Sequence, residues 1–255
     1  MKKLMLLVLA LALLAGCHNP QTADPTNAST DPATTEATTE PTQATTEDVE
    51  YEGDATSYYM DAVYPQQIDR YYTAISQQWD EVTYLDNEMC PLVARYYNCS
   101  PLDNVGFTFM DLDGDGIWEL IIGAIDNAEI NPLIFEIWAL KDDQPVMIAQ
   151  SGNHNRYYLQ YAKETDQWSV AYEAENGAAN HAVYYLQLVN GEFQVVKGVI
   201  FDMMANEENP WFATTDLDWD VSNDTPIDEA TANQMRSEGR STYAATEYFP
   251  YCLYK

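Results

Sequence analysis

The most constraining feature of the sequence is an acidic, glycine-containing loop between two apolar runs, FTFMDLDGDGIWELIIGA (residues 107–124). Acids occupy loop positions 1, 3, 5 and 9, and glycines at positions 4 and 6 allow the backbone to fold back. Such a loop can aim four carboxylates and the backbone carbonyl of position 7 at one point, which supplies most of the roughly six to eight oxygens that Ca2+ takes. The sequence therefore predicts a calcium site with the ligands Asp111, Asp113, Asp115, the Ile117 carbonyl and Glu119.

The loop differs from an EF-hand in two ways. Position 12, where an EF-hand has a bidentate Glu, is Ile122. The flanks, Phe107–Met110 and Glu119–Ile125, are short and rich in aromatic and β-branched residues, which favours strands over helices. We therefore expect a strand, a loop and a strand. The alternative, a hairpin turn whose Asp side chains bond to their own backbone, leaves the crowded carboxylates unneutralised.

This pattern resembles the calcium loops of integrin-type FG-GAP repeats, which also close with an acid at position 9. More closely, F-x-x-DLDGDG-x-x-ELIIG is similar to the hallmark of a group of uncharacterised lipoproteins of Gram-positive anaerobes. The resemblance implies a surface location and a bound metal. Because no activity is established for the group, the resemblance implies no reaction.

Residues 1–17 predict a lipoprotein signal peptide. Lys2 and Lys3 precede an apolar run, Leu4–Ala15, that is shorter than the ~20 residues of a membrane-spanning helix. The run leads into Leu-Ala-Gly-Cys, which resembles a lipobox, so Cys17 is expected to become the lipid-modified first residue of the mature protein. We expect the chain to be anchored to the cell membrane through this lipid, with its folded part on the extracellular side.

The rest of the chain divides into a stalk and a domain. Residues 18–50 contain ten Thr, four Pro and seven acids but no aromatic residue, so they bury too little apolar surface to fold and predict a disordered stalk. Residues 51–255 are long enough for one globular domain with a sizeable core.

The charge of the chain limits its partners. The full sequence has a net charge of −30, and removal of Lys2 and Lys3 leaves nine basic against 41 acidic residues, or −32. Such a chain repels nucleic acid and anionic lipid. Apart from the membrane reached through Cys17, we expect an extracellular partner that is neutral, cationic or a metal ion, and no nucleic acid.

Periodicity within residues 51–255 predicts helices at both ends and strands between them. Apolar residues at steps of three and four predict an amphipathic helix over Pro65–Thr83. A second helix, Glu88–Tyr97, requires Pro91 in its first turn. A closing helix is predicted over Pro226–Glu238, with Thr225 as its N-cap and Gly239 as its stop.

Alternating segments around turn residues predict three hairpins. They are Leu133–Leu140 with Val146–Ala149 around the turn 141–144, Arg156–Ala162 with Gln167–Ala174, and Ala182–Val189 with Glu192–Val196 around Asn190-Gly191. The expected class is α+β, an antiparallel β meander of hairpins with an N-terminal amphipathic helix and a C-terminal helix.

An all-β, propeller-like fold is the alternative, because integrin-type loops occur in propeller blades. A propeller needs at least about four blades, and the sequence contains one complete loop. Asp216, Asp218 and Asp220 repeat the spacing, but Val221 stands where the glycine of position 6 belongs. We interpret that segment as an acidic surface loop.

Three cysteines, Cys90, Cys99 and Cys252, remain beside Cys17, an odd number for an exported chain. If the segment between Cys90 and Cys99 were helical, the two would lie ~13 Å apart, beyond the ~7 Å limit for a bridge. A disulfide between them therefore requires the helix to end early, and the pairing stays open.

Motifs of catalysis are absent from the sequence: it has no HExxH, no GxSxG and no phosphate-binding loop. His154 and His181 lie in polar turns; they could converge at one edge of the sheet or simply be hydrogen-bonded turn residues. We favour a non-enzymatic surface domain that binds or presents a ligand and contains a structural calcium. The alternative is an extracellular hydrolase of cell-wall or host glycans, whose catalytic carboxyl pair the sequence does not single out.

Overall fold

Eleven strands form one open antiparallel sheet in the computed structural model, which describes residues 54–97, 100–125 and 133–255. These residues belong to one compact unit, Glu50–Lys255. The predicted signal peptide, the stalk and Cys17 lie outside the described residues, as does Cys99. Within the described part of the chain, no helix is long and apolar enough to cross a membrane.

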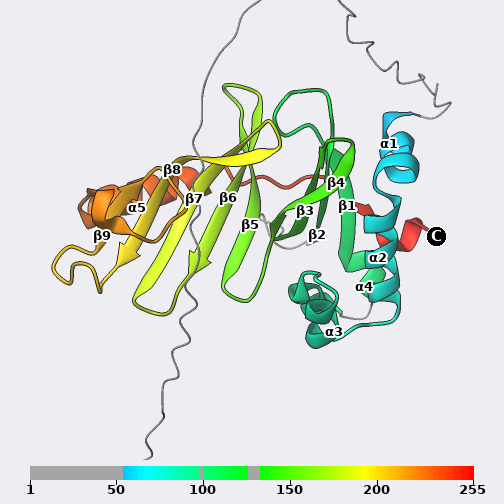
Figure 1. Ribbon diagram of the computed structural model, residues 1–255, viewed down its shortest axis with the longest axis horizontal. Helices are drawn as coiled ribbons and strands as arrows, with labels where there is room; N and C mark the ends of the chain where they lie inside the picture. Colours follow the sequence, from blue (N-terminus) through cyan, green and yellow to red (C-terminus); the bar gives the residue numbers. More distant parts are fainter. Residues whose placement is uncertain (1–53, 98–99, 126–132) are drawn as a thin grey trace, which may run out of the picture. The chain divides into compact units, whose positions relative to one another are not determined.

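The first part of the unit is helical (Figure 1). Its elements are α1 (Ala55–Tyr58), a π-helix (Tyr59–Val63), α2 (Pro65–Ser76), α3 (Glu81–Asp86), a 3-10 helix (Pro91–Tyr96) and α4 (Pro101–Asn104). The α2 face that packs on the sheet contains Ile68, Tyr71 and Ile75, as the periodicity predicts.

The predicted helix Pro65–Thr83 is wrong in its second half. Gln78 adopts a left-handed conformation, with a φ of 50°, which ends the helix. Asp80 then begins α3 by accepting a hydrogen bond from the Thr83 N–H at 2.8 Å. The second predicted helix is a shorter 3-10 helix that begins at Pro91.

The strands follow the predicted hairpins and extend them. They are β1 (Val105–Met110), β2 (Glu119–Ala124), β3 (Leu133–Lys141), β4 (Gln144–Gln150), β5 (Asn155–Ala162), β6 (Gln167–Glu175), β7 (Asn180–Val189), β8 (Glu192–Asp202), β9 (Trp211–Thr214), β10 (Thr225–Pro226) and β11 (Phe249–Pro250). Asn190 and Gly191 form the β7–β8 turn with φ values of 52° and 74°, as a two-residue primed turn requires. The turn between β3 and β4 is also two residues long, Asp142-Asp143, rather than the four predicted.

The strands lie in the order β10-β9-β8-β7-β6-β5-β3-β2-β1-β11, and β4 pairs with β3. β3 pairs with both β4 and β5, so the path departs from a simple meander there. The fold is α+β with a β-rich core. The propeller-like alternative is wrong, because the described strands form one continuous open sheet instead of separate blades.

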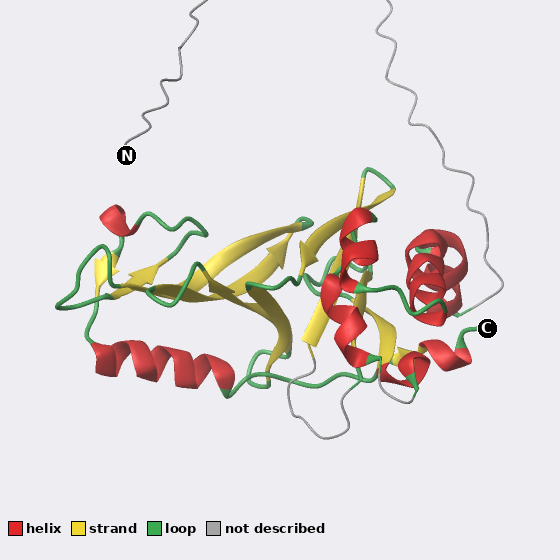
Figure 2. Ribbon diagram, turned by 90° about the horizontal axis from the view of Figure 1, so that it is seen from below, coloured by secondary structure: helices red, strands yellow, loops and turns green. Residues whose placement is uncertain are grey.

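The helical segments at both ends of the unit cover one face of the sheet. Leu133 packs in the cluster of the N-terminal helices and pairs with Tyr158 on β5. Tyr158 pairs with Ala171, and Ala171 pairs with Tyr185 on β7. Paired residues share a face, and Tyr185 touches the last helix, α5 (Glu229–Arg240), which runs along the sheet (Figure 2). We call this side the helical face.

The opposite face has a second apolar cluster that includes Ile121, Ile137 and Tyr184. Trp219 and Val221, from the segment between β9 and β10, pack against it together with Tyr248 from the C-terminal segment. Both faces of the sheet are therefore covered, one mainly by helices and the other by the segment between β9 and β10, which contains a short 3-10 helix (Val221–Asn223), and by the C-terminal segment.

The closing helix begins three residues later than predicted. Thr225 and Pro226 form β10 and pair with β9, an edge position that tolerates a proline. Asp228 is the N-cap of α5, because its Oδ1 accepts a hydrogen bond from the Thr231 N–H at 2.7 Å. Gly239, the predicted stop, lies inside the helix, which ends at Arg240.

Cys90 and Cys252 are free thiols, the first buried and the second exposed. The Cys90 thiol donates to the Ser151 carbonyl at a distance of 3.0 Å. Burial raises the pKa of Cys90 to about 12, so the thiol stays protonated and unreactive at neutral pH.

At Gly239, α5 lies close against the sheet. A Cβ on residue 239 would lie 2.0 Å from Cζ of the buried Tyr185 ring. A helical Gly→Ala change ordinarily stabilises by roughly 0.5–1 kcal/mol. We expect Gly239→Ala instead to lower the free energy of unfolding by about 1–3 kcal/mol through overpacking, as measured by urea unfolding. Ser237→Ala, at an exposed position of the same helix, is the control; a stabilised Gly239→Ala variant would contradict the contact.

Glu136 is a carboxylate buried at the helical face. It is 1 % exposed and accepts hydrogen bonds from Gln150 Nε2 at 3.0 Å and Trp138 Nε1 at 2.9 Å. Burial raises its pKa above the ordinary 4.5, although these hydrogen bonds and those from Tyr71 and the Cys90 N–H oppose the rise. The folded state therefore holds a proton on Glu136 at pH values where the unfolded chain has lost it.

It follows that stability falls as pH rises from 4.5 through the folded pKa of Glu136, by about 1.4 kcal/mol per unit of pKa difference. Glu136→Gln should remove this part of the pH dependence. Urea unfolding in chelator at pH 5 and pH 8 measures it, with the exposed Glu192→Gln as the control that removes an equal charge. If the free energy of unfolding changes by the same amount between pH 5 and pH 8 in Glu136→Gln and in Glu192→Gln, Glu136 does not titrate in this way.

Candidate functional site

The acidic loop connects two strands that pair along their whole length. β1 and β2 are in register from Val105 opposite Ala124 to Met110 opposite Glu119. The loop, residues 111–118, therefore begins and ends at the last pair of this ladder. The structure confirms the predicted order of strand, loop and strand.

Asp111 organises the loop. Its Oδ1 accepts hydrogen bonds from the N–H groups of Gly114, at 2.7 Å, and Asp115, at 3.1 Å, while Oδ2 accepts from Gly116 at 3.0 Å. Gly114 and Gly116 have φ values of 78° and 88°, a conformation that glycine adopts without strain. The backbone is thus curled around the first carboxylate.

Three of the predicted ligands meet. Carboxylate oxygens of Asp111, Asp113 and Asp115 all lie within 4.8 Å of one another, which makes them a group that could hold a metal ion. Glu119 is not part of this close group; it is 3 % exposed, and its Oε2 accepts a hydrogen bond from the Leu112 N–H at 2.9 Å. Ile117 lies at the loop surface with 40 % exposure.

The carboxylates of the loop destabilise one another's charges. Burial, and then repulsion by the three aspartates, raises the pKa of Glu119 to about 8. Burial, and then the charge of Asp115, also raises the pKa of Asp113. A cation among these groups would favour their ionised forms, which is the condition for tight binding of a hard metal ion.

Two tyrosines of the π-helix region hold the end of the loop, a support that the sequence did not indicate. The Trp118 N–H donates to Tyr59 Oη, and Tyr64 Oη donates to the Trp118 carbonyl, both at 3.0 Å. The Tyr59 and Trp118 rings stack with centroids 5.5 Å apart. Two residues more than fifty positions away in the sequence thus hold Trp118, the residue next to Glu119.

The second acidic segment shares one feature with the loop, where Asp115 Oδ1 also accepts from the N–H two residues ahead, that of Ile117, at 2.7 Å. Asp216 Oδ1 accepts from the Asp218 N–H at 3.3 Å, and Asp218 Oδ1 accepts from the Asp220 N–H at 2.9 Å. Each of these carboxylates thus binds backbone two residues ahead, as in Asx turns. Within the described residues this segment does not form a close carboxylate group like that of the loop at 111–115.

His154, in the loop between β4 and β5, and His181, which lies on β7 and not in the predicted turn, converge on a cavity of about 290 Å³ at the helical face. Its walls come from the loop between β4 and β5, from β5, β6 and β7, and from α5. Besides the two histidines, its charged lining residues are Arg156, Glu173, Glu175, Arg236 and Arg240. We call it the arginine pocket.

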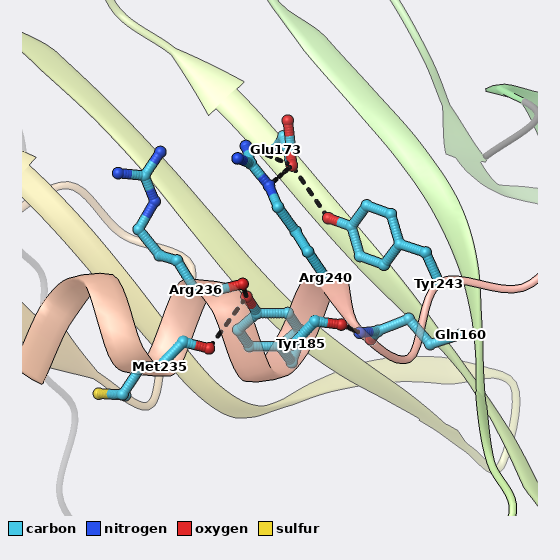
Figure 3. Close-up of polar contacts among 8 residues, drawn as sticks. Gln160, Glu173, Tyr185, Met235, Arg236, Arg240 and Tyr243 are labelled. Carbon is cyan, nitrogen blue, oxygen red and sulfur yellow. Dashed lines mark hydrogen bonds and ion pairs between the residues drawn. The ribbon is translucent and has the colours of Figure 1, made fainter. Parts of the chain in front are cut away.

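α5 supplies two of these arginines one helical turn apart, and they differ in their partners (Figure 3). Nε and Nη2 of Arg240 donate to Glu173 Oε1 at 3.1 and 3.0 Å, and Tyr243 Oη donates to the same oxygen at 2.9 Å. The Arg236 guanidinium lies 5.6 Å from the centroid of the Trp211 ring. Its Nε is buried without a hydrogen-bond partner among the described residues.

The loop side of the pocket is also held in place. Nη1 of Arg156 donates to the carbonyls of Gly152 and Asn155, the latter at 2.8 Å. The His181 ring stacks on Phe201 with centroids 4.6 Å apart. Burial, and then the positive charge of Arg236, lowers the pKa of His181, so its imidazole is neutral at pH 7.

Sequence reasoning missed the arginines of this pocket. The available signal was the spacing of Arg236 and Arg240, which puts two cations on one side of a helix in a chain with only five arginines. Their partners, Glu173 on β6 and Trp211 on β9, could not be read from that spacing.

Comparison of the chain with protein-family models, with curated proteins and with solved structures found no match.

Proposed function

We propose that this protein is a lipid-anchored protein of the extracellular surface whose folded part is stabilised by Ca2+ and binds or presents a ligand outside the cell. The ion would be bound by Asp111, Asp113, Asp115, the Ile117 carbonyl and Glu119. The observation that carries the metal site is the meeting of three aspartate carboxylates within 4.8 Å, on a loop whose backbone is already curled.

The site favours a structural role for the ion over a catalytic one. Five protein groups would fill most of a calcium shell, which leaves little room for a substrate. The loop joins β1 to β2, and all six residues of β2 are buried, so an ion that neutralises the loop would stabilise a central part of the sheet. Because the unfolded chain has no assembled site, binding energy becomes folding energy.

Calcium should therefore raise the melting temperature of the full-length protein. At ten to a hundred times the dissociation constant, mass action contributes roughly 1.4–2.7 kcal/mol, which corresponds to about 3–11 °C for a domain of this size. Asp113→Ala should remove most of this shift, because one of the three close carboxylates is lost.

The measurement is a thermal melt with Ca2+ against chelator for the parent, Asp113→Ala and Asp218→Ala proteins. Asp218→Ala is the matched control, since it removes the same group from the other acidic segment, and it should keep the full shift. A parent protein that melts at one temperature under both conditions and binds no ion in a titration would refute the metal site.

The lipid anchor rests on the sequence around Cys17. A cysteine that carries two ester-linked chains exceeds the single-chain threshold for stable membrane binding. We expect the parent protein in the membrane fraction of the expressing cells and Cys17→Ser either released or unprocessed, as measured by fractionation and the mass of the mature N-terminus. A Cys17→Ser protein that is correctly cleaved and still sediments with membranes would rule out this anchor.

The hydrolase alternative needs two carboxyls that face each other across a bound glycan. The arginine pocket offers Glu173 and Glu175, two residues apart on β6. Glu173 is already committed, since Arg240 and Tyr243 both donate to its Oε1. The binding role is therefore the better supported of the two.

A further inference from the structure

We propose that the arginine pocket binds a small oxyanion, a molecule with a carboxylate or phosphate group, through the guanidinium of Arg236. The inference names a ligand class for the binding role proposed above and rests on that role. It requires neither the calcium site nor the lipid anchor.

The pocket reverses the charge of the chain around it. The protein as a whole carries −30, yet three of its five arginines line this one cavity. Glu173 offsets Arg240 in an ion pair at 3.0 Å. Arg156 and Arg236 then face Glu175 alone, so the local balance is positive without any contribution from the histidines. Net charge predicts a neutral or cationic partner for the surface as a whole, but this cavity selects an anion.

Of the three arginines that line the pocket, Arg236 is the one without a hydrogen-bond or ion-pair partner among the described residues. It forms none of the four ion pairs found among the described residues. Its Nε–H is buried with no acceptor among the described residues, an arrangement that is rare and that destabilises the folded state. An oxyanion would supply the missing charge, and the planar fork of a guanidinium suits carboxylate and phosphate oxygens.

Neighbouring residues hold Arg236 and the other two arginines of the pocket in place. The Trp211 ring lies beside Arg236, and Tyr185 Oη donates to the Arg236 carbonyl at 3.3 Å. The Glu173 carboxylate fixes Arg240, and two backbone carbonyls fix Nη1 of Arg156. Groups that are already ordered lose little entropy on binding, which favours affinity.

The size of the cavity limits the ligand. At about 290 Å³ it lies at the lower end of the roughly 300–1,000 Å³ range of ligand pockets. It therefore suits one small molecule, the size of a single sugar acid, rather than a polymer segment. Tyr158 adds an aromatic wall on which a ring could pack.

The test uses isothermal titration of the full-length protein in non-ionic detergent. Three probes of similar size differ in charge: glucuronate, glucose and glucosamine; inorganic phosphate is the fourth. We expect at least one of the two anions to bind and neither glucose nor glucosamine to match it. Stronger binding of glucuronate would identify a carboxylate ligand, and stronger binding of phosphate would identify a phosphate ligand.

Variants then locate the site. Arg236→Gln should weaken anion binding roughly ten- to hundredfold, as expected for loss of a charged hydrogen-bonding partner. Arg70→Gln, which removes the same group from an exposed position on α2, should have no effect beyond about twofold. Glu175→Gln should tighten binding by about threefold, because it removes a nearby negative charge.

Misfolding cannot produce the tighter anion binding that is expected of Glu175→Gln, so this variant separates the proposed site from a general loss of structure. The inference is overturned if neither anion binds, if glucose binds as well as the anions, or if Arg236→Gln and Arg70→Gln behave alike. Binding of glucose alone would leave the proposed binding role standing while refuting the anion pocket. Calcium melts and membrane fractionation are read separately and do not bear on this result.

Discussion

The structure depends on the burial of β2 from both sides. All six of its residues, from Glu119 to Ala124, are buried. The first helices cover one side through Ile68, Tyr71 and their neighbours. On the same hairpin, a Cβ at Gly123 would meet Tyr248 Oη at 2.4 Å, and β11 pairs with β1. The two ends of the unit thus meet on the hairpin that carries the acidic loop, and that is why the loop is held so firmly.

The protein has two candidate sites of opposite charge, although acidic residues far outnumber basic ones in its sequence. Where carboxylates gather in a local loop, burial and then their mutual repulsion raise the pKa values of Asp113 and Glu119, and a cation would favour the charged forms. Where the few arginines gather, they enclose a cavity with the opposite preference. Net charge describes the long-range field of such a molecule, but short-range binding depends on which residues face each cavity.

Local patterns in the sequence predicted local structure well. The alternating acids gave the loop, and Asn190-Gly191 gave the β7–β8 turn, because each is decided by a few neighbouring residues. The positions at which helices and strands begin and end were predicted less accurately. Asp80 caps α3, a separate helix that periodicity had merged with α2. Asp228 caps α5, which periodicity began at Pro226. Pro226 instead pairs with β9 in an edge strand.

By itself, the sequence determined the strand, loop and strand around Asp111, Asp113 and Asp115, since a pattern of alternate acids and glycines acts within nine residues. Only the tertiary structure decided that Tyr59 and Tyr64 would hold Trp118, the residue next to Glu119. It also decided that Arg156, Glu173, His181 and Arg236, as many as eighty positions apart, would line one cavity. Such a site depends on sheet register and on how α5 lies across it, and both are set by long-range packing that no local pattern encodes.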